Sequence, residues 1–557
     1  MKNAKGFRTW TLVTILTGLF LALFSPGFAG DGDGEKGDKK DLEERIEKLE
    51  RKVAQDRLKI TGDLRVTLDN IDATMAGRFN GLALQKGIVD TLFFLGATGA
   101  FPSRPDDVGQ YIAANYGDYL FFQNNLTFDN LKQSFGSFPA EAQGALFNML
   151  LPNTWVPEQD YQNETLYTTR LRLNLRADVM ENLSFNGRLT MYKTWGDSTG
   201  VQVFNGAPNS FTLDGTNAGT PNSDIVRVDR AYFSWKKLAG SKWYLSIGRR
   251  PSTYGPPYHI RDNELRQGTP NGHVVNYQFD GITLGYNLNH WLPGNTFRLC
   301  YGVGFESGFG SGDQLKAPAD RLSDTQLGGI NWDIYNTDEM NIQMTAFGAW
   351  NVTDGFNGLV VLPADPLSGN SINAPVVLRY TPSANLGDMY LMDILLERHE
   401  MNFSWFLSYA YTQSQPNPVT TPFGGMFSDP FETPEDQSGS SIYAGIRMPL
   451  GNSSHVGLEY NHGSEYWFNF SQGADDIIGS KLATRGDVFE AYWIHGFNKG
   501  LGRARANLRL SAMYYDYEYS GSGWHVGAPK KLDEMPILAF PTYQDALDLR
   551  TSLVIKF

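Results

Sequence analysis

From Lys59 onward, apolar and polar side chains alternate in segments of about ten residues, each ending in turn-forming residues. In the first segment, ITGDLRVTLD, one face carries Ile60, Leu64, Val66 and Leu68. A period of two sends successive side chains to opposite faces of a β-strand. Strands of this length with an apolar face are typical of transmembrane barrels, whose other face meets the lumen.

The connections between these segments alternate in length along the chain. Short turns such as MENL, NTDE and GNSSH suit one rim of a barrel, and long connections suit the other. The long connections are residues 69–163, 196–223, 251–272, 352–387 and 412–439. Their spacing predicts an all-β fold, a transmembrane antiparallel β-barrel of about sixteen strands over residues 58–557. A smaller or larger barrel stays open, whereas a β-sandwich would give no such alternation of loop length.

The N-terminal residues 1–29 have the pattern of a secretory signal peptide. Lys2, Lys5 and Arg8 precede an apolar run over residues 10–24, and small residues then lead to Ala29. We predict cleavage after Ala29, because the run is short and no stop-transfer segment follows it. A retained membrane anchor is the alternative.

No apolar stretch after Ala29 reaches the roughly twenty residues that a membrane-spanning helix requires. The longest candidate, residues 81–101, is interrupted by Lys86 and Asp90. We therefore exclude a helical membrane protein and predict a loop helix in this stretch.

Two segments separate the signal peptide from the first strand. Residues 30–40, GDGDGEKGDKK, predict a flexible linker. In residues 41–57, apolar side chains recur four and three apart at Leu42, Ile46, Leu49 and Val53, which predicts a short coiled-coil helix. Because two heptads are too short to be stable alone, the helix either joins subunits, which we favour, or is a solvated amphipathic helix.

Composition and motifs exclude several classes of function. The single cysteine, Cys300, allows no internal disulfide, and no Cys/His spacing indicates haem or zinc, so we predict no cofactor and no bound metal. The net charge of −13 argues against a nucleic-acid partner. The chain lacks a GxSxG elbow, a P-loop, HExxH and a complete GxGxxG, so we predict that it is not an enzyme. Because some barrels carry catalytic sites, a cluster of His with Ser or Asp at one rim would revive that reading.

The last segment, LDLRTSLVIKF, is a period-two strand that ends on Phe557. Such an end resembles the signal by which outer-membrane barrels are recognised for insertion. Together with the signal peptide, it predicts a protein of the Gram-negative outer membrane, in contact with lipid and lipopolysaccharide.

The segment KWYLSIGRRPSTYGPP, residues 242–257, resembles the strand-and-loop signature of the DUF3373 type, a family of largely uncharacterised barrels often labelled porins in Geobacter-like bacteria. VRVDRAYFSW and NYQFDGITLGYNL extend the resemblance over most of the mature chain. The resemblance implies an outer-membrane barrel and supplies no catalytic residues. By analogy with porins we expect a homo-oligomer, with a trimer favoured.

Twelve basic side chains are candidates for the pore lining. GRRPSTYGPP opens the third long loop, which in general porins folds into the lumen and narrows it. The candidates from this region are Arg249, Arg250, His259, Arg261 and Arg266, with Asp262 and Glu264 among them. Those placed inward on strands by alternation are Arg170, Arg172, Arg176, Arg188, Arg298, Arg509 and Arg550.

Two interpretations of these charges stay open. Ladders of arginine are typical of anion-passing pores. We slightly favour a mixed lumen, in which the arginines pair with inward carboxylates and selectivity is weak. The carboxylates expected to point inward are Asp229, Asp280, Glu306, Glu459 and Asp548. For the third-loop charges, exposure on an outer loop is the alternative to lining the constriction.

The resulting functional hypothesis is a porin-like channel for passive diffusion of small hydrophilic solutes or ions. The alternative is a barrel that acts as a scaffold or sleeve for a partner, such as an electron-transfer cytochrome or a surface assembly. A wide, empty lumen with no inward loop would favour the sleeve.

Overall fold

A computed structural model describes residues 58–201, 203–204, 219–309, 315–362, 376–471, 475–497 and 504–557. The predicted signal peptide, linker and coiled-coil helix lie outside the described residues.

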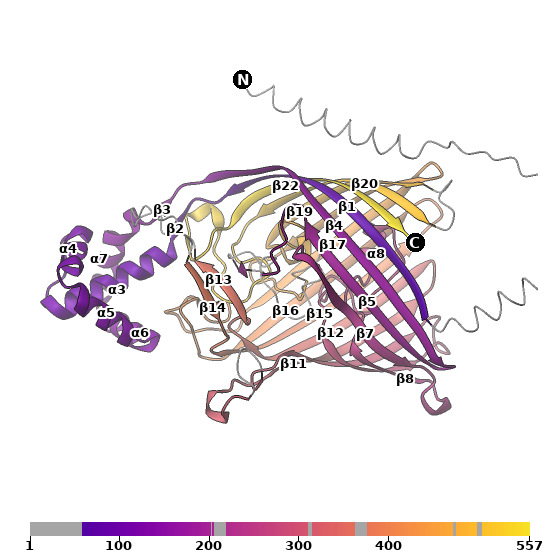
Figure 1. The fold of residues 1–557 in the computed structure, drawn as a ribbon, viewed down its shortest axis with the longest axis horizontal. Helices are drawn as coiled ribbons and strands as arrows, with labels where there is room; N and C mark the ends of the chain where they lie inside the picture. The colour runs from indigo at the N-terminus through magenta and orange to yellow at the C-terminus, as the bar shows by residue number, and fades with distance from the viewer. Residues whose placement is uncertain are drawn as a thin grey trace, which may run out of the picture.

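The described residues form a closed antiparallel barrel of sixteen strands, which confirms the predicted fold class and strand number (Figure 1). Along the chain the barrel strands are β1 (Leu58–Met75), β4 (Gln159–Met180), β5 (Leu183–Thr194), β7 (Ser223–Trp235), β8 (Trp243–Arg249), β9 (Asp280–Asn287), β10 (Thr296–Phe305), β11 (Thr325–Asn336), β12 (Met340–Thr353), β15 (Asn385–His399), β16 (Ser404–Pro416), β17 (Ser438–Leu450), β18 (Ser454–Gly463), β19 (Gly486–Phe497), β20 (Arg505–Tyr517) and β22 (Tyr543–Lys556). Each strand pairs with its neighbour along the barrel, and β1 closes the ring by pairing with both β4 and β22.

The register between β1 and β22, where the barrel closes, places apolar side chains of both strands on the same face. Leu64 lies opposite Ile555 and Val66 opposite Leu553, so apolar side chains of β1 and β22 share the outer face. Asp63 and Asp69, on the opposite face of β1, are buried inside. Closure satisfies the backbone of every strand, which a sheet edge in hydrocarbon would not.

The outer wall of the barrel is apolar. Ile60, Phe233, Ile247, Leu458 and Phe489 are each about half exposed there, as expected for side chains that lipid covers. Aromatic side chains flank the short turns: Trp235, Trp243, Trp291 and Phe403 are all exposed. Such a belt is typical of the interface between lipid and water.

The two rims differ as predicted. We call the rim with the short turns and both strand ends Leu58 and Lys556 the turn side, and the other rim the loop side. Between the barrel strands, the connections of the loop side are residues 76–158, 195–222, 250–279, 306–324, 354–384, 417–437, 464–485 and 518–542. Within them, residues 202, 205–218, 310–314, 363–375 and 472–474 lie outside the described part of the chain. We number these loops 1 to 8.

Several predicted loop boundaries need correction. β1 continues to Met75 and β4 begins at Gln159, so loop 1 is shorter than the predicted 69–163. Loop 3 runs to residue 279 rather than 272, because the residues before β9 stay inside the barrel without pairing in its wall. Loops 4, 7 and 8 were not among the predicted long connections.

Loop 1 carries five helices that lie beyond the barrel on the loop side (Figure 1). They are α3 (Gly81–Thr98), α4 (Pro105–Ala114), α5 (Tyr116–Asn125), α6 (Phe128–Gly136) and α7 (Ala140–Leu150). α3 confirms the predicted loop helix, and it packs through Leu84 and Ile88 on Leu131, Leu146 and Leu150.

No helix in the described ranges combines the length and the apolar character needed to cross a membrane.

Short strands join loops to one another on the loop side. One sheet holds β2 (Arg78–Asn80), β3 (Trp155–Val156) and β21 (Ile537–Leu538), and the other holds β6 (Val203–Phe204), β13 (Gly358–Leu362) and β14 (Val376–Tyr380).

Candidate pore and its charged lumen

Loop 3 folds into the barrel rather than out of it. Its short helix α8 (Tyr258–Asp262) lies inside the lumen in Figure 1. Tyr258 packs with Leu395 and Phe406 of the wall. On the turn side, Lys556, near the end of β22, lies 3.2 Å from Glu264, so the loop reaches far down the lumen.

Glycine permits the tight path of loop 3. A Cβ at Gly255 would lie 1.8 Å from the carbonyl oxygen of Pro270, and one at Gly268 would lie 2.4 Å from that of Thr253. The two arms of the loop therefore approach more closely than any side chain allows. Tyr254 also donates its backbone N–H to Asn276 at 2.8 Å, which fastens the arms together.

Loop 7 enters the lumen beside loop 3, a feature that the sequence did not predict. Val275 of loop 3 and Phe470 of loop 7 form a β-bridge. The amide of Asn469 donates to the carbonyls of His273 and Leu482, both at 2.8 Å. The two loops are thus one packed body inside the barrel.

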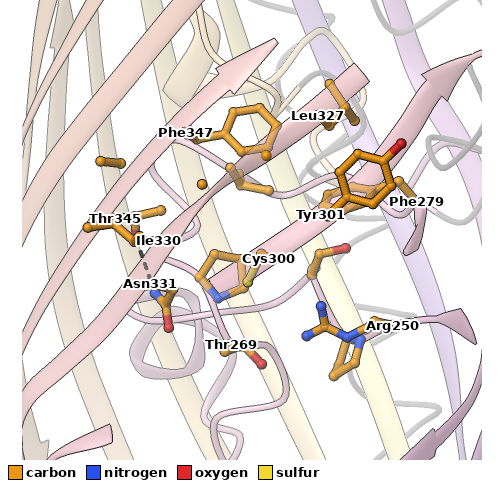
Figure 2. A pocket seen from close by; sticks show the side chains of 17 residues that line it. Arg250, Thr269, Phe279, Cys300, Tyr301, Leu327, Ile330, Asn331, Thr345 and Phe347 are labelled. Atoms are coloured by element: carbon orange, nitrogen blue, oxygen red, sulfur yellow. Dashed lines mark hydrogen bonds between the residues drawn. The ribbon is translucent and has the colours of Figure 1, made fainter. Parts of the chain in front are cut away.

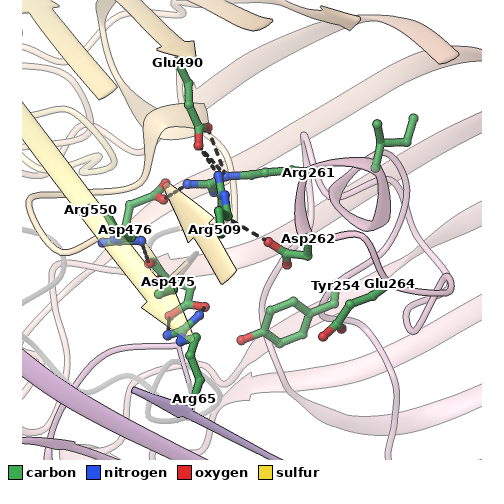
Figure 3. Close-up of polar contacts among 12 residues, drawn as sticks. Arg65, Tyr254, Arg261, Asp262, Glu264, Asp475, Asp476, Glu490, Arg509 and Arg550 are labelled. Carbon is green, nitrogen blue, oxygen red and sulfur yellow. Dashed lines mark hydrogen bonds and ion pairs between the residues drawn. The ribbon is translucent and has the colours of Figure 1, made fainter. Parts of the chain in front are cut away.

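Asp475 of loop 7 holds the first charged cluster, shown in Figure 3. Its carboxylate lies 2.5 Å from guanidinium nitrogens of both Arg65 and Arg170. Arg170 also donates to the hydroxyl of Tyr254 at 3.1 Å, and Arg550 donates to the carbonyl of Asp475 at 3.1 Å. Burial opposes the charge of Asp475, but Arg65 and Arg170 hold the pKa of this carboxyl well below its usual range.

Glu490 of β19 holds the second cluster, where three cations converge. Arg261 of α8 lies 3.0 Å from this carboxylate and 2.7 Å from Asp476. Lys481 lies 2.6 Å from Glu490, and Arg509 also pairs with it (Figure 3 draws Arg261 and Arg509). Loops 3 and 7 are therefore fastened to the same stretch of wall by buried ion pairs.

Arg230, Arg447 and Arg485 donate to loop carbonyls rather than to carboxylates. Five further inward arginines are paired with carboxylates. They are Arg172 with Asp63 (2.8 Å) and Glu264 (3.0 Å), Arg188 with Asp229, Arg266 with Asp333 (3.0 Å), Arg298 with Asp333 (2.7 Å) and Arg550 with Asp69 (2.5 Å). The geometry fits the mixed lumen better than an uncompensated ladder of arginine.

Three predicted positions need correction. Arg249 extends β8 and pairs opposite Asp280, on the outward face that also carries Ile247 and Ile282. Its guanidinium lies 3.0 Å from Asp280, so neither of these two residues lines the lumen. Glu306 is exposed at the start of loop 4.

Other predicted residues fall at the margins of the lumen. Arg176 keeps its inward register, but it stands exposed at the turn side beside Asp178. Arg250, the first residue of loop 3, is buried and donates to the hydroxyl of Ser246 at 3.3 Å. His259 lies on α8 near Glu397.

Arg250 also borders a small, partly open cavity between loop 3 and strands β10 to β12, shown in Figure 2. The cavity measures about 40 Å³ and is lined mainly by apolar groups such as Phe279, Leu327 and Phe347. Cys300 faces it and accepts a hydrogen bond from the hydroxyl of Thr283. A space of this size holds at most a water molecule or so, not a solute.

Histidine and serine do meet in the lumen, but not as a nucleophile with its base and orienting acid. His273 contacts the hydroxyls of Ser408 (2.9 Å) and Ser441 (2.8 Å) through its two ring nitrogens. Both ring nitrogens are engaged by hydroxyls and the group is fully buried, so no carboxylate orients the ring. At the loop-side rim His462 lies 2.9 Å from Asp487, a pair that catalysis could use, but among the described residues no hydrogen bond joins this histidine to a serine nucleophile.

Replacing Arg261 by Gln should shift ion preference toward cations. The change removes the arginine that pairs with Asp476 and one of the three cations around Glu490. In a narrow lumen such charge is weakly screened. Reversal potentials under a salt gradient measure the shift, which should be largest at low salt. Arg249→Gln is the matched control, since its outward position predicts no change; equal reversal potentials for both variants would contradict the assignment.

Comparison with known proteins places this geometry in context. The family model described as "Protein of unknown function (DUF3373)" matches residues 160–557. No curated protein matches the chain.

Several solved structures are similar to the chain at low identity. OmpT of Vibrio cholerae, an outer membrane protein in trimer form, has 10% identity and a TM-score of 0.37, with 90% of this chain and 99% of that chain covered. OprB of Pseudomonas putida has 9% identity and a TM-score of 0.39, with 92% and 97% covered. OmpF of Salmonella typhi in complex with daunomycin has 9% identity and a TM-score of 0.39, with 90% and 98% covered. Similarity at this level carries no conclusion about solutes.

Proposed function

Because the chain belongs to the DUF3373 family, whose members share no established function, we propose a function from the barrel itself: an outer-membrane, porin-like channel for the passive diffusion of small hydrophilic solutes or ions. The observation that carries the proposal is loop 3, which turns into a closed barrel and narrows it. Its polar and charged groups face matching charges on the wall, as in a hydrated lumen.

Pairing of the lumen charges supports weak rather than strong ion selectivity. Each of the three cations around Glu490 also meets a second carboxylate: Arg261 meets Asp476, Lys481 meets Glu459 and Arg509 meets Asp262. Paired charges leave little net potential along the path, so solutes of either sign and neutral solutes pass.

A sleeve for a cytochrome or another partner is less well supported. A sleeve requires a wide lumen, whereas loops 3 and 7 occupy the interior here. Buried ion pairs and the bridge between Val275 and Phe470 hold both loops in place. A partner could enter only after many such contacts were broken.

Liposome swelling tests the channel directly. We expect liposomes that contain the purified chain to swell in small sugars such as arabinose, and more slowly in the larger raffinose. Heat-denatured protein is the control. If folded protein, recognised by its faster gel migration before heating, admits neither sugar, the channel proposal fails.

Assembly into a homo-oligomer completes the proposal. The apolar seam at Leu42, Ile46, Leu49 and Val53 favours pairing with copies of itself, and a trimer follows from the analogy with porins. Deletion of residues 41–57 should weaken the oligomer without abolishing the barrel. Size-exclusion chromatography with light scattering measures the change, and an unchanged mass would contradict a joining role for the seam.

A further inference from the structure

Three metal-binding side chains from distant parts of the chain meet inside the barrel. His259 belongs to α8 of loop 3, whereas Glu397 and His399 stand two residues apart on β15 and so share its inward face. One potential ligand atom from each residue lies within 4.8 Å of the other two. β15 ends at His399, so the cluster lies at the turn side of the lumen.

Two atoms of this cluster are buried without a partner. Glu397 is 1% exposed, and Asn341 donates to its Oε2 at 2.7 Å. Its Oε1 and the Nδ1 of His259 have no hydrogen-bond partner among the described residues, and they lie 3.8 Å apart. Buried polar atoms without partners are costly, and two that face each other indicate a ligand between them.

We propose that His259, Glu397 and His399 bind a divalent transition-metal ion of the Zn²⁺ class, which fastens loop 3 to the barrel wall. Two imidazoles and one carboxylate are a common ligand set for zinc, with a fourth position left to water. Mg²⁺ and Ca²⁺ prefer all-oxygen sites, so the set discriminates against them.

The surroundings orient at least one ring for this role. Nδ1 of His399 meets the hydroxyl of Ser404 at 3.0 Å, which leaves Nε2 as the nitrogen that a metal can use. Ligand atoms of a tetrahedral zinc site lie roughly 3.4 Å apart, given metal–ligand distances of about 2.1 Å. The 3.8 Å between His259 and Glu397 is already close to this spacing, and no pair of ligand atoms has to close by more than about 1.4 Å around an ion.

Charges near the site limit its affinity. Arg266 and Arg447 are the nearby cations; Arg266 pairs with Asp333, and Arg447 donates to the carbonyl of Ile260 at 2.8 Å. We expect a dissociation constant in the micromolar range rather than a tighter one.

Zinc titration of the whole barrel tests the proposal without reference to transport. The full chain, purified with a tag that lacks histidine and stripped of metal, is titrated with ZnCl₂ in an isothermal calorimeter at neutral pH. We expect one site per chain that Mg²⁺ does not occupy. His399→Gln should weaken binding at least tenfold, and the triple variant His259→Gln, Glu397→Gln, His399→Gln should abolish it.

A second cluster supplies the matched control. His462, Asp487 and Glu518 also lie within reach of one ion, but they stand at the loop side and are more exposed. The variant His462→Gln, Asp487→Asn, Glu518→Gln should keep the wild-type zinc affinity. No zinc binding by the wild type would overturn the proposal, and so would binding that survives the triple variant but is lost from the control. Heat-dependent gel migration verifies that each variant is folded. If the triple variant is not, His399→Gln takes its place, and unweakened zinc binding by that variant overturns the proposal.

Discussion

Replacing Asp475 by Asn is expected to loosen the contact of loop 7 with the barrel wall and to shift ion preference strongly toward anions. The carboxylate lies between Arg65 and Arg170, and all three side chains are at least about nine-tenths buried. Removing one partner of a buried pair costs roughly 3–5 kcal/mol, because it leaves charge uncompensated in a poorly hydrated place. Limited proteolysis of residues 464–485 and reversal potentials measure the two effects.

The stabilising contribution of the Asp475 carboxylate should depend on pH. Its pKa in the folded protein lies below the unfolded value of about 4, so its stabilising contribution is present above that pH and is lost as the pH falls below it.

Asp429→Asn is the control for the Asp475→Asn substitution. Asp429 forms a more exposed pair with Lys530 at 2.5 Å, and its loss should change stability by no more than about 1 kcal/mol. Equal protease resistance of the two variants would contradict the role of Asp475.

Removal of the inner part of loop 3 should raise conductance several-fold. Replacing residues 253–275 by a short Gly/Ser link takes α8 and both arms of the loop out of the lumen. The open cross-section then grows, while the sixteen-stranded wall keeps its pairing. Single-channel recording measures the change.

Deletion of residues 81–153 is the matched control for this experiment. It removes a larger segment, the helices α3 to α7, which lie beyond the barrel (Figure 1). We expect its conductance to stay close to that of the wild type. If the loop 3 deletion also leaves conductance unchanged, the narrowest point of the path is not at loop 3.

Local periodicity was sufficient to predict the barrel wall. Alternation separates Leu64 and Val66 from Asp63 on β1, and it correctly sends Arg170 and Arg172 inward. The prediction works because lipid and lumen impose opposite demands on alternate residues of every strand.

The contents of the lumen could not be predicted in the same way. Asp475 and Lys481 belong to loop 7, where no period indicates which side chains face the wall. Arg249 was misplaced because β8 continues through it instead of ending before GRRPSTYGPP, so alternation along the strand sends its side chain outward beside Ile247. His259 and Glu397 are far apart in the chain, so only the inward course of loop 3 brings them together.

Single-channel recording of the wild-type chain in planar bilayers tests the channel most directly. Folded protein, verified by heat-dependent gel migration, is added at low concentration on one side of the membrane. We predict discrete conductance steps with weak ion preference, which become larger when loop 3 is shortened. A folded barrel that gives no conductance, with loop 3 intact or removed, would contradict the account.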